Sequence, residues 1–107
     1  MSDDAKTAGR DLPVPRLTDE YLESLVVHED YHQFPLTRLT VCCLVLRNGW
    51  ELSGEAACAN PQQFDPQVGR RQARKNALKR VKAREQYLLR QRLFEAGILE
   101  GGTPNDD

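Results

Sequence analysis

The segment from Leu39 to Ala56 constrains the fold more than any other part of the chain. Its first half, LTVCCLVLR, is rich in β-branched and apolar residues, and a second run, WELSGEA, follows Asn48-Gly49. Asn-Gly is the preferred pair for a two-residue type I′ turn because both turn positions need a positive φ. The sequence therefore predicts a β-hairpin that turns at Asn48-Gly49.

A two-residue turn also predicts the register of this hairpin. One face then carries apolar residues on both strands, and we expect it to pack on a helix. The other face, with Cys42, Leu44 and Leu46, is half apolar; because an isolated ribbon is marginal, we expect this face to meet a second copy or a partner. The expected pairs are Arg47 with Trp50, Val45 with Leu52, Cys43 with Gly54 and Val41 with Ala56.

Helices are expected on both sides of the hairpin. Thr18 is a good N-cap for a first helix, whose amphipathic spacing continues through His32 until Pro35 stops it. Asp65-Pro66 opens a second helix, which runs about 30 residues to a cap at Gly97 or breaks near Arg84. Its core-facing arc is expected to hold Ala73, Ala77, Leu78, Val81 and Leu88.

These elements predict an α+β fold, in which a β-hairpin packs against an N-terminal helix and a long, or broken, C-terminal helix. We expect one domain over residues 16–98, with disordered tails at 1–15 and 99–107, where no hydrophobic period is present. No run approaches the roughly 20 apolar residues of a membrane span. The chain has three cysteines, an odd number that argues against a disulfide framework. We therefore interpret all three as reduced thiols and expect a cytoplasmic protein.

Charge is distributed unevenly along the chain. Residues 1–35 hold three basic and eight acidic residues, whereas residues 66–95 hold ten basic and two acidic residues. This asymmetry indicates self-association or a polyanionic partner for the second half. Four basic residues share an arc apart from the apolar one, and we predict that they bind the partner: Arg71, Lys75, Lys79 and Lys82.

Other residues suggest chemistry less specifically. His28-Glu29-Asp30-Tyr31-His32 fits the motif His-Glu-x-x-His, in which two histidines on one face of a helix bind zinc. Because the spacing selects no third ligand, we expect no metal, no cofactor and no catalytic residue. Cys58 is interpreted as a small structural cysteine. Trp50 is expected to pack across the hairpin, Phe64 under the following loop, and Tyr87 against a helix.

The stretch from Leu39 to Leu93 resembles a family of small uncharacterised phage and prophage proteins, which are labelled after gene 49 of one coliphage and gene 66 of another phage. The departure at Arg84-Glu85-Gln86, where the family often has Leu-Glu-Gly, favours an unbroken helix. The segments that carry the resemblance are Leu46-Arg47-Asn48-Gly49-Trp50, Gly54-Glu55-Ala56-Ala57-Cys58, Asn60-Pro61, Phe64-Asp65, Val68-Gly69-Arg70, Ala73, Asn76-Ala77 and Tyr87-Leu88-Leu89.

The resemblance implies an accessory protein of a mobile element in a bacterial host cell, and it brings no catalytic residues. Our first hypothesis is a non-enzymatic module that binds a host or phage protein through the basic helix or a hairpin face, with a homodimer as one arrangement. The second hypothesis is a nucleic-acid-binding protein that uses the basic residues of the long helix. The third is a small zinc-dependent hydrolase. No membrane partner is expected.

Overall fold

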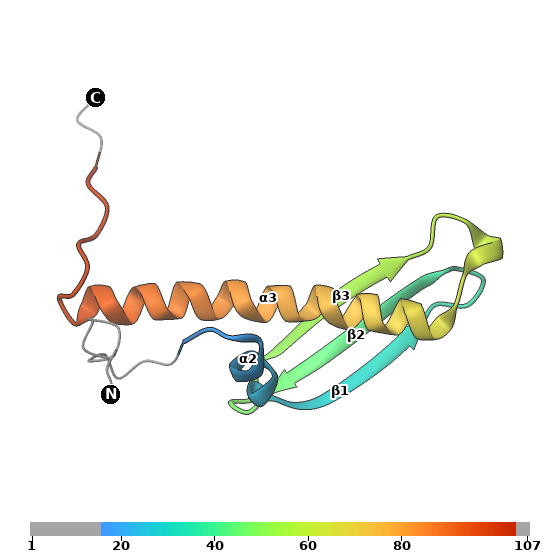
Figure 1. The fold of residues 1–107 in the computed structure, drawn as a ribbon, viewed down its shortest axis with the longest axis horizontal. Coiled ribbons are helices and arrows are strands. Elements are labelled where there is room, and N and C mark those ends of the chain that lie inside the picture. Colours follow the sequence, from blue (N-terminus) through green and yellow to red (C-terminus); the bar gives the residue numbers. More distant parts are fainter. Residues whose placement is uncertain (1–15, 105–107) are drawn as a thin grey trace.

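The computed structural model describes residues 16–104 and has an α+β fold, as predicted. A short helix, α2 (Asp19–Leu25), leads into three strands, β1 (Val26–Gln33), β2 (Leu39–Leu46) and β3 (Glu51–Ala57). A 3-10 turn, η2 (Pro61–Gln63), precedes the long helix α3 (Pro66–Glu95), which crosses one face of the sheet (Figure 1). The expected tail at 1–15 lies outside the described residues, and 99–104 contain no helix or strand.

The first helix is shorter than predicted, and its second half is a strand. Thr18 caps α2 as expected, because its Oγ1 accepts a hydrogen bond from Tyr21 N at 3.1 Å. The helix ends at Leu25, however, and β1 begins with the β-branched pair Val26-Val27, which favours a strand. Pro35 therefore follows a strand rather than ending a helix.

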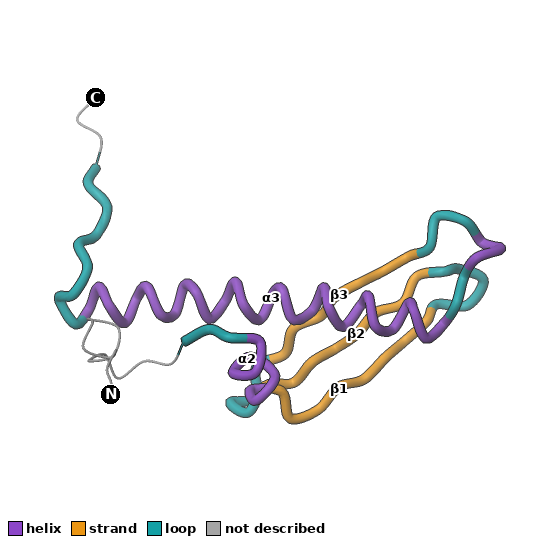
Figure 2. Tube along the Cα trace, viewed as in Figure 1, coloured by secondary structure: helices purple, strands orange, loops and turns teal. Residues whose placement is uncertain are grey.

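The sheet has three antiparallel strands in the order β1-β2-β3, instead of the two of an isolated hairpin (Figure 2). Tyr31 of β1 lies opposite Cys42, and Gln33 lies opposite Thr40. A shift of register between Val26 and His28 marks a β-bulge where the strand leaves α2. The additional strand gives β2 backbone partners on both sides.

The hairpin forms where predicted, but with a different turn. Gly49 has a φ of 89°, whereas Leu36 is the one non-glycine residue with positive φ within 16–104, so Asn48 does not have the type I′ conformation. Leu46 N donates to Trp50 O, and Gly49 N donates to Leu46 O, both at 2.8 Å. Residues 47–49 thus make a three-residue loop that ends in the left-handed glycine.

This longer loop shifts the pairing by one residue and reverses the faces of β2. Cys42 lies opposite Gly54, and Leu44 lies opposite Leu52. The predicted packing face of Val41, Cys43 and Val45 is wrong for β2: these side chains are half-buried, on the sheet face away from α3. The face expected to meet a partner, with Cys42, Leu44 and Leu46, is instead buried.

The core lies between this face of the sheet, α2 and α3. The side chains of Cys42 and Leu44 are fully buried, as are three small or β-branched residues of α3, namely Ala73, Ala77 and Val81. Leu22 and Leu25 of α2 close the same cluster at one end. Thr40 is the polar member of this buried surface, and its Oγ1 has no hydrogen-bond partner within the part of the chain that the structure describes.

Helix α3 begins and ends as the sequence predicts and is unbroken at Arg84. Asp65 accepts a hydrogen bond from Gln67 N at 2.9 Å, and Pro66 occupies the first turn. At the other end, Gly97 has a φ of 76°, and Ile98 N donates to Leu93 O at 2.9 Å, which is the Schellman arrangement. The predicted core arc is confirmed through Val81, but Leu88 is 37% exposed because α3 extends beyond the sheet (Figure 1).

Close packing of α3 on the sheet requires glycine at position 54. A Cβ built on Gly54 would lie 2.1 Å from Ala77 N and 2.4 Å from Ala73 O, both backbone atoms of α3. These atoms cannot move aside without displacing the helix. Gly54 and the two alanines therefore set the distance between the two layers.

We predict that Gly54→Ala destabilises the protein by at least about 3 kcal/mol, because the added methyl group overlaps helix backbone rather than a flexible side chain. The measurement is urea unfolding followed by circular dichroism. Gly102→Ala is the control, since nothing lies within 4 Å of its added Cβ. Equal stability of the two variants would contradict the close approach.

Candidate functional site

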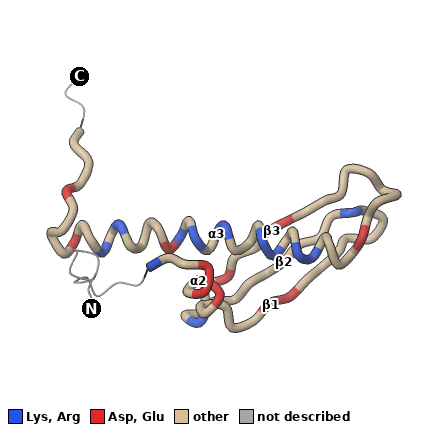
Figure 3. Tube along the Cα trace, viewed as in Figure 1, with Lys and Arg blue, Asp and Glu red and all other residues tan. Residues whose placement is uncertain are grey.

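Basic residues follow α3 along most of its length, and acidic residues gather on α2 and β1 (Figure 3). The four predicted partner-binding residues, Arg71, Lys75, Lys79 and Lys82, are all exposed. They lie on the turns of α3 that pack on the sheet through Ala73, Ala77 and Val81. The predicted separation of a basic arc from the buried arc is therefore present.

Four arginines of the same helix contact groups of the chain itself, namely Arg74, Arg80, Arg84 and Arg90. Arg80 Nη1 donates to Ser53 O at 2.9 Å, and its Nη2 lies 3.2 Å from Glu55 Oε1. The Arg84 guanidinium lies 4.9 Å from the centre of the Trp50 ring, a cation–π contact. These contacts and those of Arg74 bind part of the positive charge of α3 to the strands and to α2.

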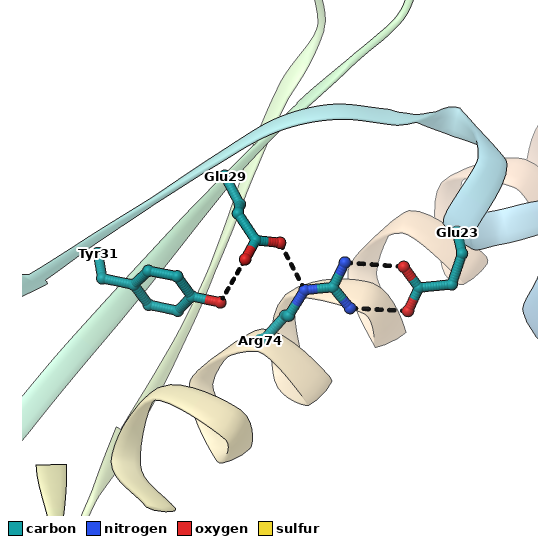
Figure 4. A network of polar contacts seen from close by, with 4 residues as sticks. All are labelled: Glu23, Glu29, Tyr31 and Arg74. Atoms are coloured by element: carbon teal, nitrogen blue, oxygen red, sulfur yellow. Dashed lines mark hydrogen bonds and ion pairs between the residues drawn. The ribbon is translucent and has the colours of Figure 1, made fainter. Parts of the chain in front are cut away.

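Arg74 forms the densest polar network of the described structure, together with Glu23, Glu29 and Tyr31 (Figure 4). Its Nη1 and Nη2 each donate to a different oxygen of Glu23 at 2.7 Å, a bidentate pair. Its Nε donates to Glu29 Oε1 at 2.7 Å, and Tyr31 Oη donates to Glu29 Oε2 at 3.1 Å. We call these four residues the Arg74 network; it fastens α2 and β1 to α3 at the β-bulge.

The network shifts the ionisation of its members. Hydrogen bonds from Arg74 lower the pKa of both Glu23 and Glu29, because they stabilise the charged carboxylates. Burial, with the nearby Cys42 and Glu29, raises the pKa of Tyr31 to about 12. Burial also raises the pKa of the Cys42 thiol, so this cysteine is kept in its unreactive protonated form.

Beside the network, a groove of about 320 Å³ separates α2 from α3. Leu22 and Leu78 supply its apolar part. Asp19 and Glu23 of α2 line one side, and three of the predicted residues of α3 line the other: Lys75, Lys79 and Lys82. We call this the lysine groove. Arg71 is absent from its lining.

The His-Glu-x-x-His motif lies on β1 and not on a helix. Side chains four residues apart on a strand share a face but are separated by roughly 13 Å, too far for one metal ion to bind both. The structural basis of the zinc-site hypothesis is therefore wrong. Within residues 16–104, no three His, Cys, Asp or Glu side chains gather closely enough to hold a metal ion.

The remaining residues singled out from the sequence divide between structural and exposed positions. Cys58 is half-buried, and its Sγ donates to Asn60 O at 3.0 Å, in agreement with a structural role at this corner. Phe64 is half-buried. Trp50, which was predicted to pack across the hairpin, is 50% exposed, and Tyr87, which was predicted to pack against a helix, is 71% exposed, so neither side chain is buried.

The Arg74 network and the lysine groove were missed at the level of sequence. Arg74 was one member of a basic run, and its partners are 45 and 51 residues away. The one available signal was the opposite charge of the two halves, which the structure brings together within a single chain.

Fold and surface define a small α+β protein with a charged groove between two helices, and no helix within 16–104 is both long and apolar enough to cross a membrane. Residues 17–93 match the model of the phage protein (N4 Gp49/phage Sf6 gene 66) family, so the chain belongs to this family. No curated protein and no solved structure matches the chain. Membership agrees with the resemblance that the sequence motifs indicated.

We predict that Arg74→Met lowers the free energy of unfolding by about 1 to 2 kcal/mol at neutral pH, because the network is partly exposed and solvent screens it. Glu23 and Glu29 have folded-state pKa values below the usual 4.5, so their contribution is complete above this pH and is lost as the pH falls through the lowered values. Urea unfolding at about pH 7 and about pH 2.5 should show that the deficit shrinks in acid.

Arg71→Met, an exposed arginine on the same helix, is the matched control and should change stability by less than about 0.5 kcal/mol at both pH values. A deficit in the Arg74 variant that stays constant between the two pH values would refute the linkage.

Proposed function

We propose that this phage protein is a non-enzymatic accessory module that binds an acidic segment of a host or phage protein in the lysine groove. The observation that supports this proposal is the combination of an apolar floor with Lys75, Lys79 and Lys82 on one side. A helix or extended segment that carries both aliphatic side chains and carboxylates fits both features. Arg71, near the start of α3, extends the same positive surface along the helix.

Charge on the opposite side of the groove favours protein over nucleic acid. Asp19 and Glu23 line the groove together with the lysines. A phosphate backbone carries a negative charge at every nucleotide and would meet these carboxylates along its length, whereas a protein segment can place neutral side chains opposite them. Arg74, Arg80 and Arg84 are bound to groups of the chain itself, which leaves a smaller basic stripe than the sequence suggests. The nucleic-acid hypothesis therefore becomes the alternative outcome of the test.

The test is the variant Lys75→Glu/Lys79→Glu, compared with wild type for capture of proteins from lysates of infected host cells and for affinity toward the purified captured protein. We expect the fold to be unchanged, since exposed charges alter stability by less than about 0.5 kcal/mol. We expect affinity to fall by about tenfold or more, because two attractive charges become repulsive.

Arg47→Glu/Arg70→Glu is the matched control, because it changes net charge equally at exposed positions outside the groove lining. It should retain the partner. If the Lys75→Glu/Lys79→Glu variant retains every partner of the wild type, the proposal is wrong. Binding of DNA by wild type that weakens steeply with salt, with a log–log slope reduced by about 2 in the lysine variant, would favour the nucleic-acid alternative.

A further inference from the structure

The two edges of the sheet differ in how their backbone groups are satisfied. On the outer edge of β3, Asn76 Nδ2 donates to Glu55 O at 2.7 Å, and Arg80 Nη1 donates to Ser53 O at 2.9 Å. Side chains of α3 thus occupy the acceptors that an added strand would need. Covering of an edge in this way is a common protection against strand addition.

The edge formed by β1 has no such cover from residues 16–104. In an antiparallel sheet, successive residues of a strand direct their backbone N–H and C=O groups to opposite sides. Leu46 N donates to Trp50 O and Phe34 N donates to Leu39 O, which fixes this alternation in β2 and β1. The backbone groups of Glu29, Tyr31 and Gln33 therefore point away from β2. Tyr31 N donates to Asp30 Oδ1 at 2.9 Å. For Glu29 and Gln33, no hydrogen bond to the outward backbone groups comes from anywhere in residues 16–104.

We propose that β1 pairs antiparallel with β1 of a second copy of this chain, which gives a two-fold dimer with one six-stranded sheet. Each chain offers one open edge and one covered edge, so pairing of the open edges uses both and leaves none for further growth. Pairing of the open edges therefore gives a closed dimer rather than a growing fibre. It does not involve the lysine groove, which lies between α2 and α3.

Charge selects the register of this pairing. If Tyr31 lies opposite Tyr31 of the second copy, Glu29 lies opposite Gln33, and Asp30 lies opposite His32, twice by symmetry. Shifting the register by two residues in one direction places Asp30 opposite Asp30 of the second copy. This register is disfavoured because the two carboxylates repel each other. In the favoured register the Asp30 carboxylate exchanges Tyr31 N–H for the imidazole of the second copy's His32.

Space for the second copy is available beside β1. Helix α3 lies over β2 and β3, and β1 forms the uncovered side of the sheet (Figure 1). Three hydrogen-bonded pairs supply about six main-chain hydrogen bonds. This contact is small beside the roughly 1,200 Å² of a stable interface, so we expect a weak dimer with a dissociation constant in the micromolar range or above.

Sedimentation equilibrium of the full chain from about 1 μM to 1 mM measures the dissociation constant. Gln33→Pro removes an outward N–H without removing a bond to β2, and we expect it to abolish the dimer with the fold retained by circular dichroism. Glu51→Pro is the matched control, because the N–H of this exposed residue points away from β2 at the covered edge. It should dimerise as wild type does.

A charge exchange tests the register. Asp30→Lys places a cation opposite His32 and should weaken the dimer about tenfold, whereas Asp30→Lys/His32→Asp restores opposite charges and should return affinity to within about threefold of wild type. Wild type that is monomeric at about 1 mM, or a Glu51→Pro variant that loses the dimer while Gln33→Pro keeps it, would overturn the proposal. Failure of the double variant to regain affinity would overturn the register.

Discussion

The close contact between α3 and the sheet is the constraint on which the rest of the structure depends. Gly54 has no side chain to separate the layers, and Ala73 and Ala77 meet it with the smallest side chains that a helix tolerates well. Because the layers are so near, three strands and one long helix enclose a core without large aromatic residues. Leu22 and Leu25 of α2 then complete this core at one end, where the Arg74 network fastens the short helix.

Local signals predicted those parts of the fold that depend on neighbouring residues. Asp65-Pro66 and Gly97 define the two ends of α3 because capping involves residues only a few positions apart. The turn was placed correctly, but Asn48-Gly49 fits both a two-residue and a three-residue loop, and that one-residue ambiguity reversed the faces of β2. The strand β1 was missed because its residues fit a helical spacing, and its pairing with β2 is non-local.

Dependence on non-local contacts also explains which parts of the candidate site could be predicted from the sequence. The basic arc could be read from the periodicity of one helix, and its exposure is confirmed. Which basic residues are bound within the chain depends on how α2 and β1 meet α3, since Arg74 reaches Glu23 and Glu29 across the fold. The acidic first half of the chain therefore neutralises part of the basic second half internally, where the sequence alone left an external partner or a second copy as the explanation.

The extension of α3 beyond the sheet has a consequence for how the molecule unfolds. Among the described residues no side chain of α3 past Val81 is fully buried, and residues 82–95 are rich in strong helix formers, among them alanine, leucine, glutamine and arginine. A free peptide of this length is only marginally helical, but here the packed half supplies the nucleus and removes the initiation cost. One continuous helix thus spans two levels of local stability, and its backbone amides should become accessible to solvent exchange from Glu95 inward long before the core opens.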